Sequence, residues 1–434
     1  MKLQASNFAK IEKADINIDG ITVICGDNDT AKSTIGKILF SIFDSNFNME
    51  KKIIYELGKD IEEIIIRDIY TRNKKMSNMF HPRFRLVSGR AFLEKINYPD
   101  KNNIKLNNIK EAIIEYFPKE ILVNIDNDII DNISKYILEK INTPYDKIIE
   151  EIINRYFNSI FKNQINNLFY KESSANLKLE IKKRFMNINF ENDECIKFKS
   201  EFNITHNVFY IDNPFIIDNL DKNGELSIIE NKLINSLTKG YNSDPLEGIF
   251  DSVNAKDTLK EVYDIISKIV DGKIIEKNGN FYINYREYNV NINLNNLSTG
   301  LKSFIIIKML LENGSLGKKD VLILDEPEIH LHPEWQLIYA ELIVLLQKYF
   351  ELNIVITTHS HYFLDAINRF SIKYEINKLV NFYITGYAGN KKNIVFANVN
   401  DKLDEIYKKM YLPLEKLKNM RLEENNEKRN SWWT

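Results

Sequence analysis

Residues 21–43 read ITVICGDNDTAKSTIGKILFSIF, and this stretch decides the fold. Its first five residues are mostly apolar and mostly β-branched, which is typical of a buried strand. The nine residues from Gly26 to Thr34 nearly match G-x-x-x-x-G-K-[ST], a loop whose backbone N–H groups wrap phosphate groups. Apolar residues then recur at the spacing of an amphipathic helix, at Ile35, Ile38, Leu39, Ile42 and Phe43. We therefore expect a strand, a phosphate-binding loop and a helix, in that order.

Ala31 departs from this pattern, because it stands where the last glycine belongs. If the loop needs a positive φ at this position, an alanine costs about 1 kcal/mol, since its Cβ crowds the backbone there. We expect the departure to weaken nucleotide binding without removing the site. Taken alone, the stretch also fits an ordinary turn between a strand and a helix.

The composition excludes several classes of protein. With 434 residues, 44% hydrophobic and 28% charged, the chain is long enough for two or three soluble globular domains. A net charge of −2 argues against a chain that binds nucleic acid with its whole surface, although it leaves room for a local basic face. Two cysteines are too few for a disulfide framework or a four-cysteine zinc site. Because no apolar run approaches the roughly 20 residues that span a bilayer and no signal peptide is evident, we expect a cytoplasmic protein without a membrane partner.

Hydrophobic periodicity divides the chain into four expected segments. Residues 1–45 are an N-terminal, strand-rich lobe that ends in the loop and its helix. Residues 46–205 are predicted to be a helical insertion, since apolar residues recur there mostly at helical spacing. Residues 206–400 return to strands, with a hairpin whose turn is Asn278-Gly279. Residues 401–434 are predicted to be a helical tail.

Two adjacent carboxylates follow an apolar strand within VLILDEPEIHLHPEWQ, residues 321–336. Ligands of open α/β sheets bind at the carboxyl ends of strands, so Asp325 and Glu326 are placed to act on one. We expect Asp325 to hold Mg²⁺ and Glu326 to polarise an attacking water. Hydrolysis of a phosphoanhydride needs little beyond such positioning and charge neutralisation. The alternative is a capped strand end without chemistry.

Two further motifs lie near predicted strand and helix ends. Ser298 and Gly300, in LSTGLKS, open a helix, and a helix N-terminus with free N–H groups attracts anions. His359 ends the apolar run NIVITT and lies within reach of the carboxylates if the two strands are neighbours. A helix cap and a structural histidine are the respective alternatives.

Together, the stretches GDNDTAKST, LSTGLKS, LILDEPE and TTHS resemble the ATP-binding cassette (ABC) ATPase heads of the SMC/RecF/OLD kind. Two stretches, DEPEIHLHPEWQ and TTHSHYFLDAI, are especially similar to OLD-like ATPases and to ATPase subunits of bacterial anti-phage systems such as Septu and PARIS. The resemblance covers Met1 to about Phe43 and about Val208 to Val399. It implies an α/β fold, in which a β-rich lobe and a parallel-sheet P-loop core form an ABC-ATPase head with a large helical insertion.

The resemblance also implies a role for each motif residue. Asp325 becomes the Walker B ligand of Mg²⁺, Glu326 the catalytic base and His359 the switch that senses the γ-phosphate. Ser298 and Gly300 become the signature that touches ATP bound to another protomer. The Walker A loop is implied to consist of Gly26, Asn28, Thr30 and Ala31 around the phosphates, Lys32 on the β- and γ-phosphates as a catalytic residue, Ser33 on Mg²⁺ and Thr34 on the phosphates.

Two observations qualify this assignment. No glutamine lies between Thr34 and Gln164, so the glutamine with which the family helps to hold Mg²⁺ and the lytic water has no counterpart, and we expect slow turnover. His330 and His332 have the H-x-H spacing of metal ligands. The resemblance instead places them in a loop that faces the dimer partner.

The expected function is an ATP-hydrolysing head that forms a homo-dimer or higher oligomer around ATP. It would regulate or scaffold a partner effector, of nuclease or Toprim type, in phage defence. The alternatives are a RecF/SMC-like ATPase that binds DNA in repair, and a nucleotide-bound scaffold with little turnover. A self-contained nuclease is disfavoured because the residues after Thr385 lack the acidic pattern of a Toprim domain. A transporter motor is disfavoured by the long separation of Thr34 from Ser298.

Overall fold

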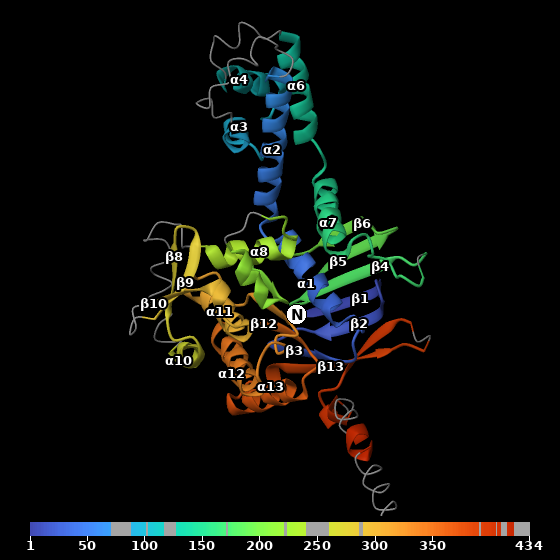
Figure 1. Ribbon diagram of the computed structural model, residues 1–434. Helices are drawn as coiled ribbons and strands as arrows, with labels where there is room; N and C mark the ends of the chain where they lie inside the picture. The colour runs from blue at the N-terminus through green and yellow to red at the C-terminus, as the bar shows by residue number, and fades with distance from the viewer. Residues whose placement is uncertain are drawn as a thin grey trace, which may run out of the picture. The chain divides into compact units, whose positions relative to one another are not determined.

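The chain forms two compact units in the computed structural model (Figure 1). The first combines Met1–Phe47 with Ile153–Thr434, and the second is Asn48–Ile152. The structure describes residues 1–70, 88–100, 103–116, 127–170, 172–220, 224–239, 260–285, 290–389, 392–404, 406–408 and 415–420.

Eleven strands of the described residues form one sheet in the first unit, in the order β6-β5-β4-β1-β2-β14-β13-β3-β12-β11-β7. The strands β13, β3, β12, β11 and β7 run parallel to one another, whereas β1, β2, β4, β5 and β6 pair antiparallel. The sheet therefore joins a β-rich lobe to a parallel core, as predicted. The strand bounds are β1 Lys2–Phe8, β2 Ile11–Asn17, β3 Ile21–Cys25, β4 Ala175–Ile181, β5 Arg184–Glu191, β6 Glu194–Ser200, β7 Val208–Ile211, β11 Val321–Asp325, β12 Asn353–Thr358, β13 Val380–Tyr387 and β14 Ile394–Asn398.

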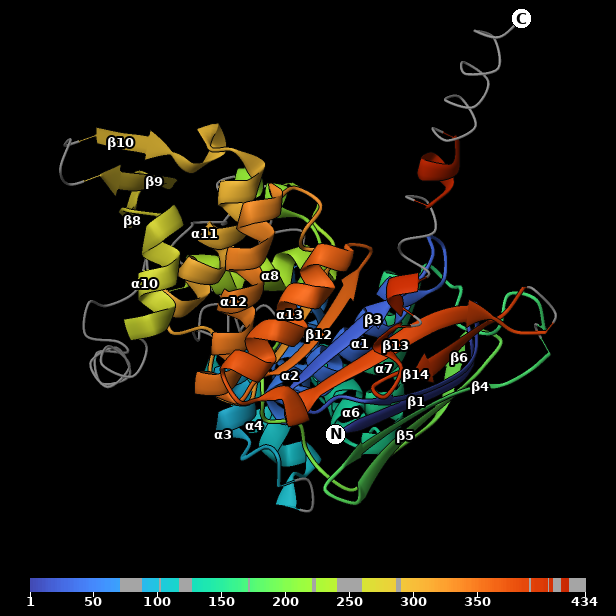
Figure 2. The same cartoon turned by 90° about the horizontal axis from the view of Figure 1, so that it is seen from below.

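The N-terminal strand β3 lies in the middle of the parallel core, between β12 and β13 (Figure 2). All five of its residues are buried, as expected for a strand covered on both faces. In the register, Cys25 pairs with Thr358, and Thr357 pairs with Asp325. The carboxyl ends of β3, β12 and β11 therefore meet at one edge, where the three expected motifs begin.

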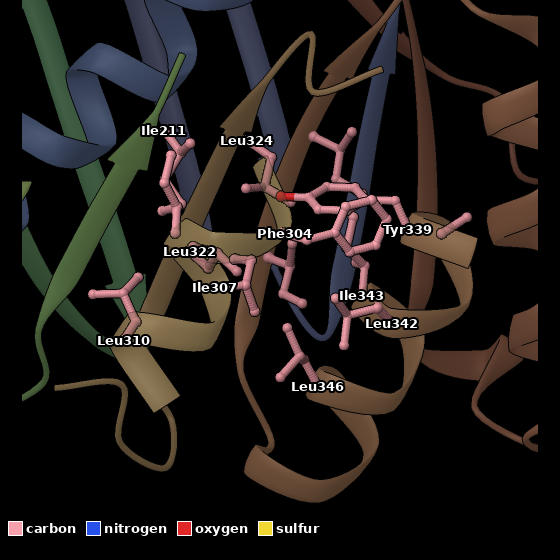
Figure 3. Close-up of a cluster of buried hydrophobic side chains, with 14 of the residues drawn as sticks. Ile211, Phe304, Ile307, Leu310, Leu322, Leu324, Tyr339, Leu342, Ile343 and Leu346 are labelled. Atoms are coloured by element: carbon pink, nitrogen blue, oxygen red, sulfur yellow. The ribbon is translucent and has the colours of Figure 1, made fainter. Parts of the chain in front are cut away.

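Helices cover the parallel core, and their apolar faces build the main hydrophobic cluster (Figure 3). Phe304 and Tyr339 are both fully buried and meet edge to face, with ring centroids 5.0 Å apart. Burying such a side chain contributes about 1.5–3 kcal/mol, so this cluster anchors the helices that carry the motifs. The helices of this region are α1 Lys32–Asn46, α8 Ile228–Thr238, α10 Lys260–Ile269, α11 Thr299–Glu312, α12 Pro333–Phe350 and α13 His361–Lys373.

Aromatic rings support the β-rich lobe. Phe8 of β1 and Phe190 of β5 pack against the end of α7, Tyr145–Phe161. The ring centroids of Phe8 and Phe161 are 4.9 Å apart, as are those of Phe157 and Phe190. These edge-on and tilted contacts fasten β5 and the end of α7 to β1.

The predicted helical insertion over residues 46–205 is wrong in its C-terminal part. Residues 175–200 form the strands β4, β5 and β6 and extend the main sheet. Met186, Ile188 and Phe190 alternate with exposed or half-exposed residues, which is the two-residue period of a strand with one buried face. The same alternation is present in the sequence, where Asn187 and Asn189 separate these apolar residues, so the strand had a local signal that the prediction missed.

The second unit is helical, in agreement with the first part of that prediction. Its core joins side chains such as Ile61, Phe92, Ile113 and Ile137. Gly58 and a second glycine, Gly89, let two helices approach closely, because a Cβ on Gly89 would lie 1.8 Å from the Gly58 carbonyl oxygen. Its helices are α2 Met49–Tyr70, α3 Gly89–Lys95, α4 Leu106–Tyr116 and α6 Asn127–Ile141.

The predicted hairpin is confirmed as part of a small sheet, β8 Lys273–Lys277, β9 Asn280–Tyr285 and β10 Val290–Asn293. Asn278 and Gly279 both have positive φ, 54° and 79°, as a two-residue hairpin turn requires. In the predicted tail, residues 415–420 are helical, whereas residues 421–434 lie outside the described part of the chain. None of the described helices has the length and apolar character needed to cross a membrane.

Candidate nucleotide site

Gly26 begins the loop where β3 ends, and only glycine fits there. Its φ is 154°, and an added Cβ would lie 1.7 Å from Oγ1 of Thr385. Thr30 closes the loop from the other side, since its hydroxyl donates to the Asp27 carbonyl oxygen at 2.6 Å and lies 2.6 Å from the Thr385 hydroxyl. The loop is therefore fixed against β13. Thr385 was not predicted, because nothing in its local sequence marks it as a partner of the loop.

Ala31 has φ 56° and ψ 24°, so the loop does need a left-handed residue at the position of the missing glycine. Such a conformation costs an alanine about 1–2 kcal/mol. Asp29 also has positive φ, and its carboxylate lies 2.5 and 2.6 Å from the Lys10 ammonium. The strained loop is thus held by contacts on both sides.

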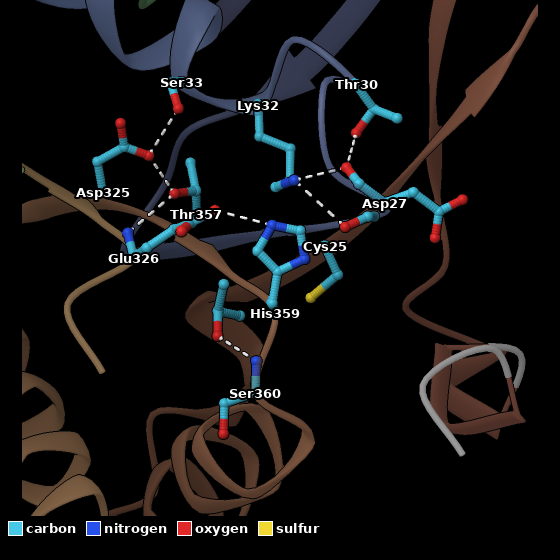
Figure 4. Close-up of polar contacts among 12 residues, drawn as sticks. Cys25, Asp27, Thr30, Lys32, Ser33, Asp325, Glu326, Thr357, His359 and Ser360 are labelled. Atoms are coloured by element: carbon cyan, nitrogen blue, oxygen red, sulfur yellow. Dashed lines mark hydrogen bonds and ion pairs between the residues drawn. The ribbon is translucent and has the colours of Figure 1, made fainter. Parts of the chain in front are cut away.

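Lys32 opens α1 and is buried, and its ammonium turns back over the loop (Figure 4). It donates to the carbonyl oxygens of Gly26 at 3.2 Å and of Asp27 at 2.8 Å. Burial lowers the pKa of Lys32, and the negative charges of Glu326 and Asp325 oppose that shift. The Lys32 ammonium is therefore held beside the loop, where a side chain that binds phosphate is expected.

Asp325 and Ser33, the two residues expected to hold Mg²⁺, lie in contact. The Ser33 hydroxyl donates to Oδ1 of Asp325 at 3.0 Å, and the Thr357 hydroxyl donates to the same oxygen. Tyr210 of β7, which was not predicted, donates to Oδ2 at 2.6 Å. The hydroxyl of Ser33 and the carboxylate of Asp325 are hard oxygen donors of the kind that Mg²⁺ takes, together with phosphate and water.

Glu326 and His359 also meet. Nε2 of His359 lies 2.8 Å from Oε1 of Glu326, a close polar contact that is not aligned as a hydrogen bond. Burial, and then the positive charge of Lys32, lower the pKa of His359, while Glu326 opposes this shift. Glu326 has φ 51°, and its N–H donates to the Thr357 carbonyl oxygen at 3.1 Å. The backbone thus turns sharply just where the carboxylate is presented.

A cavity of about 220 Å³ lies beside these groups. Ser33, Asp325 and Glu326 form one wall, and Asp212 and Asn213, at the end of β7, line another. Desolvation raises the pKa of Asp212, and the negative charge of Asp325 raises it further. Asp212 was not predicted, because the sequence did not reveal that β7 borders β11.

The proposed signature residues lie apart from this wall. Ser298 is exposed at the N-terminus of α11 and makes no capping hydrogen bond with its side chain. Gly300 is buried, since an added Cβ would lie 3.0 Å from the His330 carbonyl oxygen and 3.2 Å from the Trp335 ring. Among the described residues, those that line the cavity do not include Ser298.

The remaining predicted residues lie on the loop and its helix. Asn28 is exposed on the loop, and Thr34 is half-buried in the first turn of α1. His330 packs edge to face on Phe215, with ring centroids 5.7 Å apart. Within the described part of the chain, no group of three or more histidine, cysteine or carboxylate side chains is arranged to hold a metal ion.

Comparison with known proteins places the chain in a family. The family model described as an AAA ATPase domain matches residues 1–364. No curated protein matches the chain.

Solved structures that it resembles include the SMC head domain from Thermotoga maritima, with 11% identity, a TM-score of 0.36 and coverage of 92% of this chain and 98% of that one. An SMC head bound to the C-terminal winged-helix domain of ScpA has 11% identity, a TM-score of 0.43 and coverage of 93% and 98%. Because the family model spans most of the sequence, the chain belongs to the AAA ATPase domain family.

Proposed function

We propose that the chain binds ATP with Mg²⁺ and hydrolyses it slowly, as an ABC-type head. The observation that carries this proposal is the convergence of Lys32, Ser33, Asp325, Glu326 and His359 at one edge of the sheet. They come from three neighbouring strand ends that are far apart in sequence. A fold without this chemistry has no reason to gather a buried lysine, two carboxylates and a histidine around a loop of left-handed residues.

The residues divide the chemistry among them. Lys32 and the loop N–H groups bind the phosphates, and Ser33 and Asp325 would hold Mg²⁺, which would supply neutralisation of the phosphate charge. Glu326 accepts a proton from a water molecule while the oxygen of that water bonds to the γ-phosphorus. The bond between the γ-phosphorus and the bridging oxygen breaks, which gives ADP and phosphate. His359 contacts Glu326 and orients it.

Asp212 takes the place of the missing glutamine in this proposal. It lies at the end of a strand that pairs with β11 and faces the cavity shared by Ser33 and Glu326. A carboxylate can accept a hydrogen bond from the attacking water, but it adds a negative charge close to Asp325 and Glu326. Turnover slower than in an enzyme with a neutral amide follows from that extra charge.

We further propose that two chains associate around ATP. Ser298 is exposed at the end of a helix whose free N–H groups suit a phosphate supplied by a second copy. ATP would then bridge two protomers, and its hydrolysis would release them to regulate an effector, of nuclease or Toprim type, in phage defence. A DNA-binding repair ATPase is the alternative, supported by Lys197 and Lys199, which are exposed on the edge strand β6.

The test compares Glu326→Gln, Ser298→Glu and the wild-type chain. We expect Glu326→Gln to lower phosphate release by about 100-fold or more while ATP still binds, since only the base is lost. Gel filtration of this variant should show an ATP-dependent increase in size. Ser298→Glu should abolish that increase without weakening ATP binding to the single chain.

Ser200→Glu, the same change at another exposed serine, is the matched control and should leave association intact. Unchanged phosphate release in Glu326→Gln would rule out the assigned base. ATP binding without any change of size would favour the nucleotide-bound scaffold. Loss of salt-sensitive DNA binding in Lys197→Glu with Lys199→Glu would support the repair alternative.

A further inference from the structure

Glu328 is buried between the two catalytic strand ends, although its sequence position gives no hint of a role. Its exposed fraction is 3%. Oε1 accepts hydrogen bonds from the Thr358 hydroxyl, from the backbone N–H of His359 at 3.0 Å and from that of Ser360 at 3.2 Å. A single carboxylate oxygen therefore holds three consecutive residues of the switch segment.

The second carboxylate oxygen of Glu328, Oε2, differs from Oε1 in its surroundings. Oε2 is buried and has no hydrogen-bond partner among the described residues. Burying an unsatisfied polar atom is costly, so a carboxylate is a poor choice at this position unless its paired oxygen does something that an apolar side chain cannot. The three bonds to Oε1 supply that reason.

A second group of hydrogen bonds joins the same two segments. Gln336, in the first turns of α12, donates to the carbonyl oxygens of Glu328 at 3.3 Å and Leu331 at 3.2 Å, and its Oε1 accepts from the Ser360 hydroxyl at 2.9 Å. The turn that follows Glu326 and the segment that carries His359 are therefore joined by side chains as well as by the strand pairing.

We propose that Glu328 is a positioning residue that sets the place of His359 against Glu326. The backbone N–H of His359 bonded to Glu328 and the imidazole 2.8 Å from Glu326 belong to one residue, so a shift of the first moves the second. Glu328 is not among the described residues that line the cavity, and it acts through His359. This inference rests on the proposed function, and it gives the residue three positions after Asp325 a part in it.

The first test measures turnover. In Glu328→Ala, kcat should fall by about tenfold or more while KM for ATP stays within about twofold, as for a residue that acts on the transition state alone. Glu328→Gln keeps an acceptor oxygen and should recover most of the loss. Gln347→Ala, a buried polar residue of α12 with an exposed fraction of 5%, is the matched control for burial and should keep kcat.

A double variant separates positioning from mere stability. If Glu328 acts through His359, adding Glu328→Ala to His359→Ala should change kcat by less than about twofold, because coupled residues are not additive. If the kcat of the double variant falls by the product of the two single-variant losses, the proposal is overturned. If Glu328→Ala does not fold, Thr358→Val, which removes one of the three donors, replaces it in the same cycle.

A third measurement does not depend on hydrolysis. The chain has six histidines, so imidazole signals in the NMR spectrum of the nucleotide-free protein can be assigned by substitution. Glu328→Ala should shift the His359 signals and Gln347→Ala should not. If the chain does not hydrolyse ATP but Glu328→Ala shifts the His359 signals, the proposed function is refuted and the positioning of His359 by Glu328 is retained. If the His359 signals do not shift in Glu328→Ala, the positioning role of Glu328 is refuted.

Discussion

Replacing Ala31 by glycine tests where the strain of the loop is compensated. The alanine has φ 56°, and the contacts of Thr30 with Thr385 and of Asp29 with Lys10 hold the loop in this left-handed conformation. We therefore expect the same conformation in the free and in the ATP-bound chain. Such a conformation costs an alanine about 1–2 kcal/mol. A glycine removes that cost but loses about 0.4–1 kcal/mol through the greater freedom of the unfolded chain. The net gain in unfolding free energy should therefore be about 1 kcal/mol.

ATP affinity, in contrast, should stay within about twofold, because the strain is the same in the free and bound loop and cancels in the binding equilibrium. Urea unfolding followed by circular dichroism measures the stability, and titration calorimetry in the Glu326→Gln background measures the affinity without turnover. Ala9→Gly is the matched control, since Ala9 also has a positive φ, 47°, in the turn between β1 and β2. It should add a similar stability and leave ATP binding unchanged.

The opposite result would refute this reasoning. If Ala31→Gly tightens ATP binding about tenfold, equivalent to 1.4 kcal/mol, and leaves unfolding unchanged, the loop must become strained only when it closes on the nucleotide. The expectation of weaker binding drawn from the sequence would then hold, and the departure from the loop pattern would limit ATP occupancy.

Three further predictions concern the surroundings of the loop. Tyr210→Phe removes the donor that lies 2.6 Å from Asp325, so Mg²⁺-dependent ATP affinity should fall several-fold and stability by about 1 kcal/mol, measured by titration with and without Mg²⁺; unchanged affinity in Mg²⁺ would show that Asp325 does not need this support. Because burial and Lys32 lower the pKa of His359 from 6.5, the imidazole stays neutral below that pH, and phosphate release should persist at pH 6.5 and decline only at lower pH. Because the pKa of His359 is lower in the folded chain than in the unfolded chain, its contribution to stability is complete above pH 6.5 and is lost as the pH falls through the lowered pKa. The free energy of unfolding should therefore decrease less steeply with falling pH in His359→Gln than in the wild-type chain. An equal slope in the two proteins would contradict this prediction.

Much of the site could be predicted from local sequence. An apolar strand followed by Asp325 and Glu326, another followed by His359, and a loop followed by Lys32 each carry their own signal, because strand, turn and helix patterns are local. Their meeting followed from one rule, that parallel strands end at a common edge. The hairpin turn at Asn278-Gly279 was equally local, and it was confirmed.

The residues that were missed depend on pairing across long stretches of chain. Tyr210 and Asp212 matter because β7 borders β11, and Thr385 matters because β13 borders β3. Glu328 acts on a segment about 30 residues later. The strands β4 to β6 are a different case, because apolar and polar residues alternate in β4 and β5 and this signal is local. The helical pattern of the preceding residues was extended over them.

The central place of β3 has a consequence for synthesis on the ribosome. This strand ends at Cys25, but its neighbours β12 and β13 begin at Asn353 and Val380. At translation speeds of roughly 5–20 residues per second, the strand that precedes the loop waits on the order of 15 to 65 seconds for its partners. During that interval a strand whose residues are all buried in the folded chain is exposed, so chaperone occupancy should matter more for this protein than for one whose sheet grows from consecutive strands.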